Sequence, residues 1–419
     1  MNKKQKKLSK YNCYLTQSGY TLIFNTQKCS SVVFDNETFK RFKKNKLTKE
    51  EEKILEQLDI IVDKDINEID LFLTKSRINN SNNDSLFFRI YTTLGCNAKC
   101  PYCYQKDRNK INMTIKTAED ISSFIVKKSS GYKTVKIEWF GGEPLCNIKV
   151  IDLISSRVKN ELSSKGINFV SSMVSNGYLF DNQLIIKSFN DWNLRKIQIS
   201  LDGMGEYYEE IKQFGNVDSF NKVIENISNL ADTGVFVNIR LNYSNENIDE
   251  ICKLLDFLSE KFKNNVNINV YGHRIFDIHK NNDIKISERL DTKFYYKLKE
   301  VGFKAEDITN MAPKTTKCMA YSINSLLIYP DGKLYKCPQS VGFEEYNIGS
   351  IYLEDFNKSI SKWYSPRLPQ KCLKCKYLPL CNGGCLFVNL TKHRACEYNN
   401  SIIKTKMQKQ LLDYLKTLK

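Results

Sequence analysis

The stretch LFFRIYTTLGCNAKCPYCYQ, residues 86–105, joins a run of strand-forming residues to three cysteines. Its first eight residues are mostly aromatic or β-branched, which predicts a buried β-strand. Cys96, Cys100 and Cys103 follow in what reads as a short loop. In parallel sheets, chemistry collects at the carboxyl ends of the strands, where the loops converge. The stretch therefore predicts a site that begins where this strand ends.

Five further runs of the same kind follow along the chain. They are KTVKIEWF, NFVSSMV, RKIQISL, VFVNIRL and VNINVYG. Amphipathic segments separate them, among them a helix expected to begin after a cap at Thr114 and another expected to end before Gly234. Strands that alternate with helices are typical of a parallel sheet. The sequence predicts an α/β fold, a partial (β/α)6 barrel of the TIM type over residues 86–275.

The segments on either side of the barrel predict smaller modules. Residues 1–80 are expected to form a small α+β domain with strands YNCYLTQ, YTLIFNT and SSVVFD and helices NETFKRFKK and TKEEEKILEQL. The polar stretch SRINNSNNDS, residues 76–85, is expected to be a linker. After the barrel we expect a helical connector over 276–315, a cysteine-rich domain over 316–400 and a C-terminal helix over 401–419.

The composition favours a cytoplasmic protein with metal or redox chemistry. The start of the chain lacks the apolar stretch of a secretory signal, and no apolar run approaches the roughly 20 residues of a membrane span. Because cytoplasmic thiols stay reduced, the 14 cysteines favour metal or redox sites over disulfides. Cys13, Cys29, Cys146 and Cys252 are scattered, and we expect them to be core or surface thiols.

The net charge of +17 is compatible with a nucleic-acid partner, but the pattern of lysines does not favour one. The lysines are spread over several segments, and the chain has no helix-turn-helix or base-stacking motif. We expect a solvated basic surface, or attraction of an acidic peptide, and no nucleic-acid or membrane partner.

The spacing C-x3-C-x2-C of the first three cysteines predicts an iron–sulfur site. Thiolates at positions i, i+4 and i+7 let one loop place three ligands around a four-iron cube and leave one iron without a protein ligand. A structural zinc site is the alternative. It requires four ligands, and no histidine lies nearby to complete the set.

With Tyr102 directly before the last cysteine, this segment resembles the radical SAM superfamily. The resemblance implies that Cys96, Cys100 and Cys103 are the catalytic ligands of a [4Fe-4S] cluster whose open iron binds S-adenosylmethionine (SAM). It further implies reductive cleavage of SAM to a 5′-deoxyadenosyl radical that abstracts a hydrogen from the substrate. A low-potential electron donor, such as flavodoxin or ferredoxin, would be required.

Residues at the other predicted strand ends resemble the SAM-binding positions of this family. The GGEP turn at residues 141–144 is similar to the turn with which family members hold the amino group of SAM, and its glycines would let the backbone approach the ligand. The SAM-binding candidates are Tyr102, Gly141, Gly142, Glu143, Ser175 and Asn176, then Ser200 and Asp202 for the ribose, and Lys212 or Arg240 for the carboxylate. Arg240 could equally be a salt-bridged barrel residue.

Seven more cysteines form a second field near the C-terminus. In order they are Cys318, Cys337, Cys372, Cys375, Cys381, Cys385 and Cys396. With Gly332 before the second of them, their rhythm resembles the SPASM domain of radical SAM enzymes that modify peptides and proteins. A zinc ribbon could explain part of the field but not seven thiols.

The SPASM resemblance implies two auxiliary clusters, and thus three [4Fe-4S] clusters in all. It assigns Cys372, Cys375, Cys381 and Cys396 to an outer cluster and Cys318, Cys337 and Cys385 to an inner one. The inner cluster lacks a fourth cysteine. Its remaining iron either is open, where a substrate thiolate could bind, or is ligated by a scattered thiol or by water.

Together these features predict a maturase of a ribosomally made precursor peptide, and three alternatives stay open for the function. The first is a thioether or other side-chain crosslink in a cysteine-containing peptide, with the module at 1–80 resembling a leader-recognition domain. The second is another radical outcome: epimerisation, a carbon–carbon crosslink or sulfatase-type oxidation, the last disfavoured because Pro338, not an acidic residue, follows Cys337. The third is a non-catalytic zinc-binding or nucleic-acid-binding protein, and the module at 1–80 could be a capping domain only.

Overall fold

The computed structural model describes residues 5–81, 84–103, 105, 110–215, 218–275, 284–303, 318–364, 368–392 and 400–418. Contacts within the chain define two units. The barrel unit comprises Asn83–Ala305 and Asn324–Ser361. The front unit comprises Met1–Asn82, Glu306–Ile323 and Lys362–Lys419.

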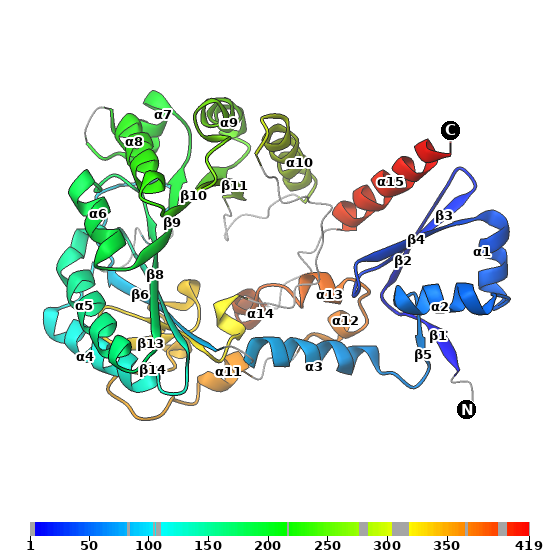
Figure 1. The fold of residues 1–419 in the computed structure, drawn as a ribbon, viewed down its shortest axis with the longest axis horizontal. Helices are drawn as coiled ribbons and strands as arrows, with labels where there is room; N and C mark the ends of the chain where they lie inside the picture. The colour runs from blue at the N-terminus through cyan, green and yellow to red at the C-terminus, as the bar shows by residue number, and fades with distance from the viewer. Residues whose placement is uncertain are drawn as a thin grey trace. The chain divides into compact units, whose positions relative to one another are not determined.

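A single mixed sheet forms the centre of the barrel unit (Figure 1). The six predicted strands are confirmed as β6 (Ser85–Thr93), β7 (Thr134–Gly141), β8 (Asn168–Ser175), β9 (Leu194–Leu201), β10 (Phe236–Tyr243) and β11 (Ile268–Arg274). Each is parallel to its neighbour in chain order. The carboxyl ends of these strands therefore lie along one edge of the sheet, as the predicted partial barrel requires.

Helices cover one face of this sheet (Figure 1). They are α4 (Ile115–Lys128), α5 (Ile148–Ser164), α6 (Asn182–Asn190), α7 (Gly205–Lys212), α8 (Ser219–Asp232) and α9 (Ile248–Phe262). Thr114 caps α4 by accepting from the backbone N–H of Thr117, and Gly234, just beyond α8, has φ +87°. Both predicted helix boundaries are confirmed.

The strands of the barrel alternate between an apolar and a polar face. On β9, Ile197, Ile199 and Leu201 are fully buried, whereas Gln198 and Ser200 between them are only partly buried. Burial of each such aliphatic side chain contributes roughly 1.5–3 kcal/mol. The apolar residues hold the helices against the sheet, and the polar residues are left for the opposite face.

Part of the predicted cysteine-rich domain extends the barrel sheet. Strand β12 (Ser325–Ile328) pairs in parallel with β6, and β13 (Lys333–Tyr335) and β14 (Gly349–Ser350) follow it antiparallel. Gly332 turns the chain between the first two of these strands at φ +85°. The segment 316–400, expected as one domain, is thus divided between the two units.

The front unit contains a three-stranded antiparallel sheet. It consists of β2 (Asn12–Gln17), β3 (Tyr20–Asn25) and β4 (Ser30–Asp35), followed by α1 (Asn36–Lys43) and α2 (Lys49–Gln57), as the sequence predicts. One sheet face packs on those helices through Ile23, Phe34, Phe42 and Leu55. The other packs on α15 (Asn400–Thr417), where Phe24 contacts a cluster that includes Met407 and Leu411.

The predicted linker over residues 76–85 is wrong for most of its length. Helix α3 (Glu68–Ser81) runs into it, after a two-stranded sheet of β1 (Lys6–Leu8) and β5 (Ile61–Asp63). Phe72 and Ser76 are buried on one face of α3, so packing carries the helix through residues of low intrinsic preference. Composition alone indicated a loop here, and tertiary contact decided otherwise.

The remaining elements are short, apart from α10 (Ile284–Glu300). This helix lies within the range of the expected connector, while 276–283 and 304–317 lie outside the described residues. The short elements are η1 (Pro144–Asn147), η2 (Met319–Tyr321), η3 (Pro338–Ser340), η4 (Glu344–Tyr346), α11 (Ile360–Tyr364), α12 (Gln370–Leu373), α13 (Leu378–Cys381) and α14 (Leu386–Lys392). In the part of the chain that the structure describes, no helix combines the length and apolarity needed to cross a membrane.

Candidate functional site at the strand ends of the barrel

The cysteine loop begins at the carboxyl end of β6. The sulfur of Cys96 accepts from the backbone N–H of Ala98 at 3.4 Å and lies 3.9 Å from Nδ2 of Asn176, at the end of β8. Farther along, the backbone N–H of Cys103 donates to the carbonyl of Cys100 at 3.2 Å. Hydrogen bonds from N–H groups to sulfur favour the thiolate form, which is the form that ligates iron.

The three thiols affect one another electrostatically. Burial of its sulfur raises the pKa of Cys96 to about 11, although much of this residue is exposed, and the neighbouring Cys100 adds to the shift. Burial likewise raises the pKa of Cys100, with Cys103 contributing. A bound cation would favour the thiolate forms of Cys96 and Cys100 over this effect of burial.

The three thiols are suitable ligands for an iron–sulfur cluster, although in the structure they are not gathered around one point. Among the described residues, no three histidine, cysteine, aspartate or glutamate side chains are grouped as a metal site. The loop nevertheless supplies three thiols within one short segment and N–H donors to the first of them. This chemistry suits a cube of iron and sulfide better than a single ion.

The GGEP turn packs backbone to backbone against the cysteine loop. A Cβ at Gly141 would lie 2.1 Å from the carbonyl oxygen of Thr93, and one at Gly142 would lie 2.3 Å from that of Gly95. The backbone N–H of Glu143 donates to the same Gly95 carbonyl at 2.9 Å. The glycines are therefore required by close contact with the loop, a reason different from the ligand approach expected from the sequence.

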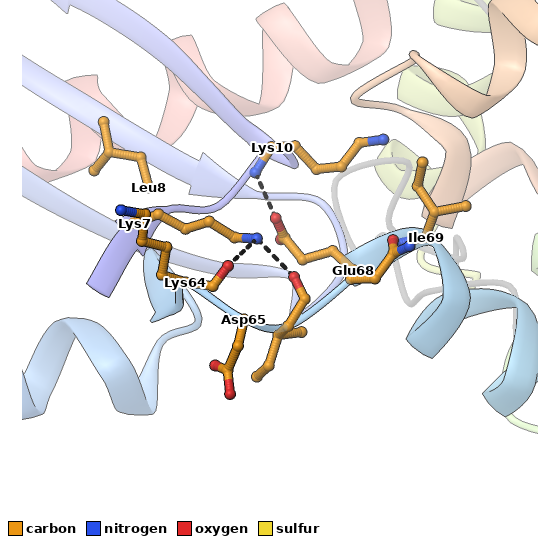
Figure 2. A pocket seen from close by; sticks show the side chains of 9 residues that line it. Lys7, Leu8, Lys10, Lys64, Asp65, Glu68 and Ile69 are labelled. Atoms are coloured by element: carbon orange, nitrogen blue, oxygen red, sulfur yellow. Dashed lines mark hydrogen bonds between the residues drawn. The ribbon is translucent and has the colours of Figure 1, made fainter. Parts of the chain in front are cut away.

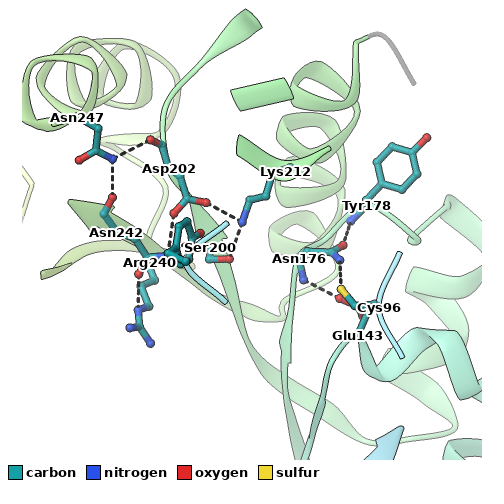
Figure 3. Close-up of polar contacts among 11 residues, drawn as sticks. Cys96, Glu143, Asn176, Tyr178, Ser200, Asp202, Lys212, Arg240, Asn242 and Asn247 are labelled. Carbon is teal, nitrogen blue, oxygen red and sulfur yellow. Dashed lines mark hydrogen bonds and ion pairs between the residues drawn. The ribbon is translucent and has the colours of Figure 1, made fainter. Parts of the chain in front are cut away.

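Glu143 is completely buried at the end of β7. Its carboxylate accepts from the hydroxyl of Ser175 at 2.9 Å and from the backbone N–H groups of Asn176 at 2.8 Å and Leu145 at 3.2 Å. Burial nonetheless raises the pKa of Glu143 to about 7. Two predicted SAM contacts, Ser175 and Asn176, thus bind this carboxylate. Figure 3 shows the contact with Asn176.

A buried ion pair lies at the end of β9. Nζ of Lys212 is 2.7 Å from Oδ2 of Asp202 and donates to the hydroxyl of Ser200 at 3.0 Å. The two charged side chains are 2% and 1% exposed. Burial lowers the pKa of Lys212, but the Asp202 carboxylate, together with Tyr102, Cys100 and Tyr208, outweighs burial and holds that pKa well above its ordinary value. The carbonyl of Lys212 also accepts from the backbone N–H of Lys99 in the cysteine loop at 2.9 Å.

Arg240 lies on β10, beside this pair. Its Nε donates to Oδ1 of Asn242 at 3.0 Å. Among the described residues, no carboxylate forms an ion pair with it, so the salt-bridged alternative finds no partner there. Tyr102 reaches the same region, since its hydroxyl is 3.5 Å from Nδ2 of Asn242. Burial raises the pKa of Tyr102.

Sequence reasoning missed two groups at this site. Asn242 and Asn247 are buried amides that bind Asp202. The signal for Asn242 was the alternation of apolar and polar residues in VNIRLN, residues 237–242. Cys146, expected to be a scattered thiol, lies within electrostatic reach of Cys96 and Glu143. It follows the GGEP turn by only two residues, which was the available signal.

The strand ends thus hold three thiols, a buried carboxylate and a buried ion pair along one edge of the sheet. A comparison with protein families identifies the domain that contains them. Residues 90–258 match the model of the radical SAM superfamily. The barrel is a radical SAM domain. Its cysteine loop and GGEP turn both fall inside the matched range.

Curated relatives of this radical SAM domain include two kinds of enzyme. A probable GTP 3′,8-cyclase of Methanococcus maripaludis is 33% identical over 152 residues, 36% of this chain and 48% of that protein. The chain thus spans about half the length of such relatives. A cysteine-type anaerobic sulfatase-maturating enzyme of Clostridium novyi is 27% identical over 330 residues, 69% of this chain and 84% of that protein.

Solved structures share the fold beyond the radical SAM domain. The anSMEcpe structure with bound AdoMet has a TM-score of 0.61 at 18% identity, covering 80% of this chain and 98% of that one. The Streptococcus suis SuiB structure bound to S-adenosylmethionine has a TM-score of 0.55 at 17% identity, covering 94% of this chain and 99% of that one. At such low identities, the TM-scores show a similar fold and no more.

Only some cysteines of the second field lie near one another in the structure. In the front unit, Cys385, Cys318, Cys381 and Cys372 all lie within electrostatic reach of Tyr321, whose pKa is raised chiefly by burial and further by these thiols. Cys337 belongs to the barrel unit, and Cys396 lies outside the described residues. The division of these cysteines into inner and outer clusters therefore stays a prediction.

The front unit also holds a pocket of about 430 Å³ beside β1 and the start of α3 (Figure 2). Nζ of Lys7 donates to the carbonyls of Lys64 and Ile66, and the backbone N–H of Lys10 donates to the buried carboxylate of Glu68. Among the described residues, none of the three lysines pairs with a carboxylate. The pocket is basic and carries no thiol.

Proposed function

We propose that this protein is a radical SAM maturase that modifies a ribosomally made peptide, forming a thioether or another side-chain crosslink. The observation that carries the proposal is the convergence of the cysteine loop, Glu143 and the Asp202–Lys212 pair at one sheet edge. A catalyst that binds both a cluster and a charged cosubstrate needs these donors together.

The residues of the site divide the work of binding. Cys96, Cys100 and Cys103 would hold the cluster. SAM would be bound by three further groups of residues. Glu143 would bind its amino group, Ser200 and Asp202 its ribose, and Lys212 or Arg240 its carboxylate. When bound, the cluster and SAM supply a 5′-deoxyadenosyl radical. Burial of Glu143 and Lys212 excludes water from both side chains, which strengthens any polar contact they make with a ligand.

Three observations support a peptide as the substrate over a nucleotide. The match to the sulfatase-maturating enzyme spans 69% of this chain, against 36% for the GTP cyclase. Structures of anSMEcpe with a Cp18Cys peptide and of SuiB with its precursor peptide SuiA share the fold. The front unit offers a sheet with β2 and β4 at its edges, to which an extended leader could add as a strand.

The finer parts of the proposal rest on the second cysteine field. Two auxiliary clusters, for a total of three, would use Cys318, Cys337, Cys385 and the outer set of Cys372, Cys375, Cys381 and Cys396. An open iron in the inner cluster would bind a cysteine of the substrate, because iron of this kind prefers sulfur ligands. Pro338 after Cys337 disfavours sulfatase-type oxidation.

The proposal is tested by anaerobic reconstitution of the full chain, followed by iron counting, electron paramagnetic resonance and detection of 5′-deoxyadenosine. Candidate precursor peptides are then incubated with SAM and a reductant, and the product is weighed. A crosslink removes two hydrogens, whereas epimerisation in light water leaves the mass unchanged. Normal processing of peptides without cysteine would exclude the thioether, and a colourless zinc protein that never cleaves SAM would exclude both radical alternatives.

A further inference from the structure

Asn242, at the end of β10, joins side chains from three other positions in the barrel (Figure 3). Its Oδ1 accepts from Nε of Arg240 at 3.0 Å, and its Nδ2 donates to Oδ1 of Asp202 at 2.9 Å. The same nitrogen is 3.5 Å from the hydroxyl of Tyr102. The residue is only 7% exposed, so water is a poor substitute for these contacts.

The chemistry of its two neighbours requires an amide at this position. The guanidinium of Arg240 can only donate, and the carboxylate of Asp202, when ionised, can only accept. One orientation of the Asn242 amide satisfies both. An aspartate would place a second carboxylate against Asp202, and an apolar side chain would leave both neighbours without this partner.

A second amide fixes the backbone under this contact. Nδ2 of Asn247 donates to the carbonyl of Asp202 at 3.1 Å and to that of Asn242 at 3.0 Å. The ends of β9 and β10 are thereby held together. Orientation of the Asn242 side chain consequently decides where the Asp202 carboxylate lies, since the backbone beneath it is already fixed.

The contacts of Asn242 lead in two directions. Through Asp202 they reach Lys212, whose carbonyl binds the cysteine loop at Lys99. Through Oδ1 they reach Arg240, whose terminal nitrogens form no ion pair among the described residues. The Asn242 amide thus links Arg240 and, through Asp202, Lys212. These are the two cations that are candidates for binding the SAM carboxylate.

We propose that Asn242 is a positioning residue of the SAM site, which holds the Asp202 carboxylate beside Lys212 and orients the guanidinium of Arg240. The proposal rests on the proposed binding of SAM by this barrel. It does not assign Asn242 a contact with SAM. Its effect is exerted through Asp202 and Arg240.

The strand supplies a matched control at Asn238. This residue lies four positions earlier on β10, is 8% exposed and accepts from Nδ2 of Asn269 at 3.1 Å. Among the described residues, its side chain forms no hydrogen bond with the ion pair or the cysteine loop. Asn238→Asp therefore introduces the same chemical change on the same strand, away from the proposed site.

The experiment measures SAM binding to the reconstituted full chain by anaerobic equilibrium dialysis, together with the electron paramagnetic resonance of the reduced cluster with and without SAM. We expect Asn242→Asp to weaken SAM binding by at least about tenfold, as loss of a hydrogen bond to a charged group requires. The spectral change caused by SAM should shrink, while iron content stays at the wild-type level. Asn238→Asp should stay within about twofold of wild type.

Asn242→Ser serves as a second variant, because it removes the bridge without adding charge and is tolerated even where a new carboxylate prevents folding. Wild-type SAM affinity and an unchanged spectral response in Asn242→Ser or in well-folded Asn242→Asp would overturn the inference. An equal loss in Asn238→Asp would also overturn it, since the effect would then be one of general stability. If the wild-type protein itself binds no SAM, the proposed function fails instead.

Discussion

The two cysteine fields are held in place by different means. The first is tied to the barrel by backbone hydrogen bonds: the loop pairs with Glu143 of the GGEP turn and with Lys212 at the end of α7. In the second field, Cys372 and Cys381 lie on helices of only four residues, α12 and α13, where the bonds are mostly local, such as that from Cys375 N–H to the Cys372 carbonyl at 3.0 Å. Its longer-range bonds in the front unit come from side chains, as from Lys10 to the Leu373 carbonyl at 2.6 Å.

This difference indicates what stabilises the conformation of each cysteine field. A parallel sheet supplies the first field with a fixed frame before any metal binds. Short helices are only marginally stable by themselves, so the second field depends more on the groups bound to it. The proposed site of radical generation would then be pre-formed. The proposed auxiliary clusters would hold the second field together as well as take part in the chemistry.

The largest effect should come from the first field itself. Cys96→Ala removes one of three protein ligands of the proposed cluster, so we expect loss of about four iron atoms per chain and background levels of 5′-deoxyadenosine. Cys252→Ala, at a thiol on α9, is the control and should retain both. Iron counting and product analysis check the result, and full activity in Cys96→Ala would contradict the assigned ligand set.

The frame around the first field should also be sensitive to one methyl group. Gly142→Ala places a Cβ 2.3 Å from the Gly95 carbonyl, so the cysteine loop or the GGEP turn must move. We expect several-fold lower iron incorporation, with cooperative unfolding retained. Gly131→Ala is a control, since a Cβ there meets no atom within 4 Å although φ is +86°. Equal effects of the two changes would show that the frame is adaptable.

Removal of iron should distinguish the two fields. On chelation, amide hydrogen exchange across residues 370–385 is expected to accelerate by roughly tenfold or more, because short helices lose the groups that cross-link them. The amides of β6 should stay protected, since they belong to the central sheet. Equal acceleration in both regions would mean that the barrel, too, depends on its cluster.

A further predicted effect concerns the pH dependence of stability and Glu143. Its pKa is raised from 4.5 to about 7 by burial, so the protonated form is favoured in the folded protein. Its contribution to stability is full below about pH 4.5 and is lost as pH rises through 7, a change of roughly 3 kcal/mol at most. Urea unfolding of the SAM-free protein at pH 5.5 and 8 should show this loss in wild type and not in Glu143→Gln. A pH response of the same size in the variant would exclude Glu143 as its source.

Much of the barrel could be predicted from local pattern. Six strand runs, the cap at Thr114 and the terminating Gly234 all depend on neighbouring residues, and all six strands, the cap and the glycine are confirmed. The stretch 76–85 was misread because composition reports intrinsic preference, whereas burial of Phe72 and Ser76 extends α3 through it. The spacing of the first three cysteines likewise predicts a cluster site at the end of β6, and this ligand set stays a prediction.

What the sequence by itself determined is the order of strands and the residue types at their ends, because hydrophobic period and ligand spacing are local properties. Only the tertiary structure decided which of those residues meet. In the tertiary structure Lys212 pairs with Asp202, and Glu143 accepts hydrogen bonds from Ser175 and Asn176. Cys146 lies near Cys96. Asn242 contacts Arg240 directly and reaches Lys212 through Asp202. These partners lie up to tens of residues apart on different strands, and the parallel register that brings them together follows from packing of the whole sheet.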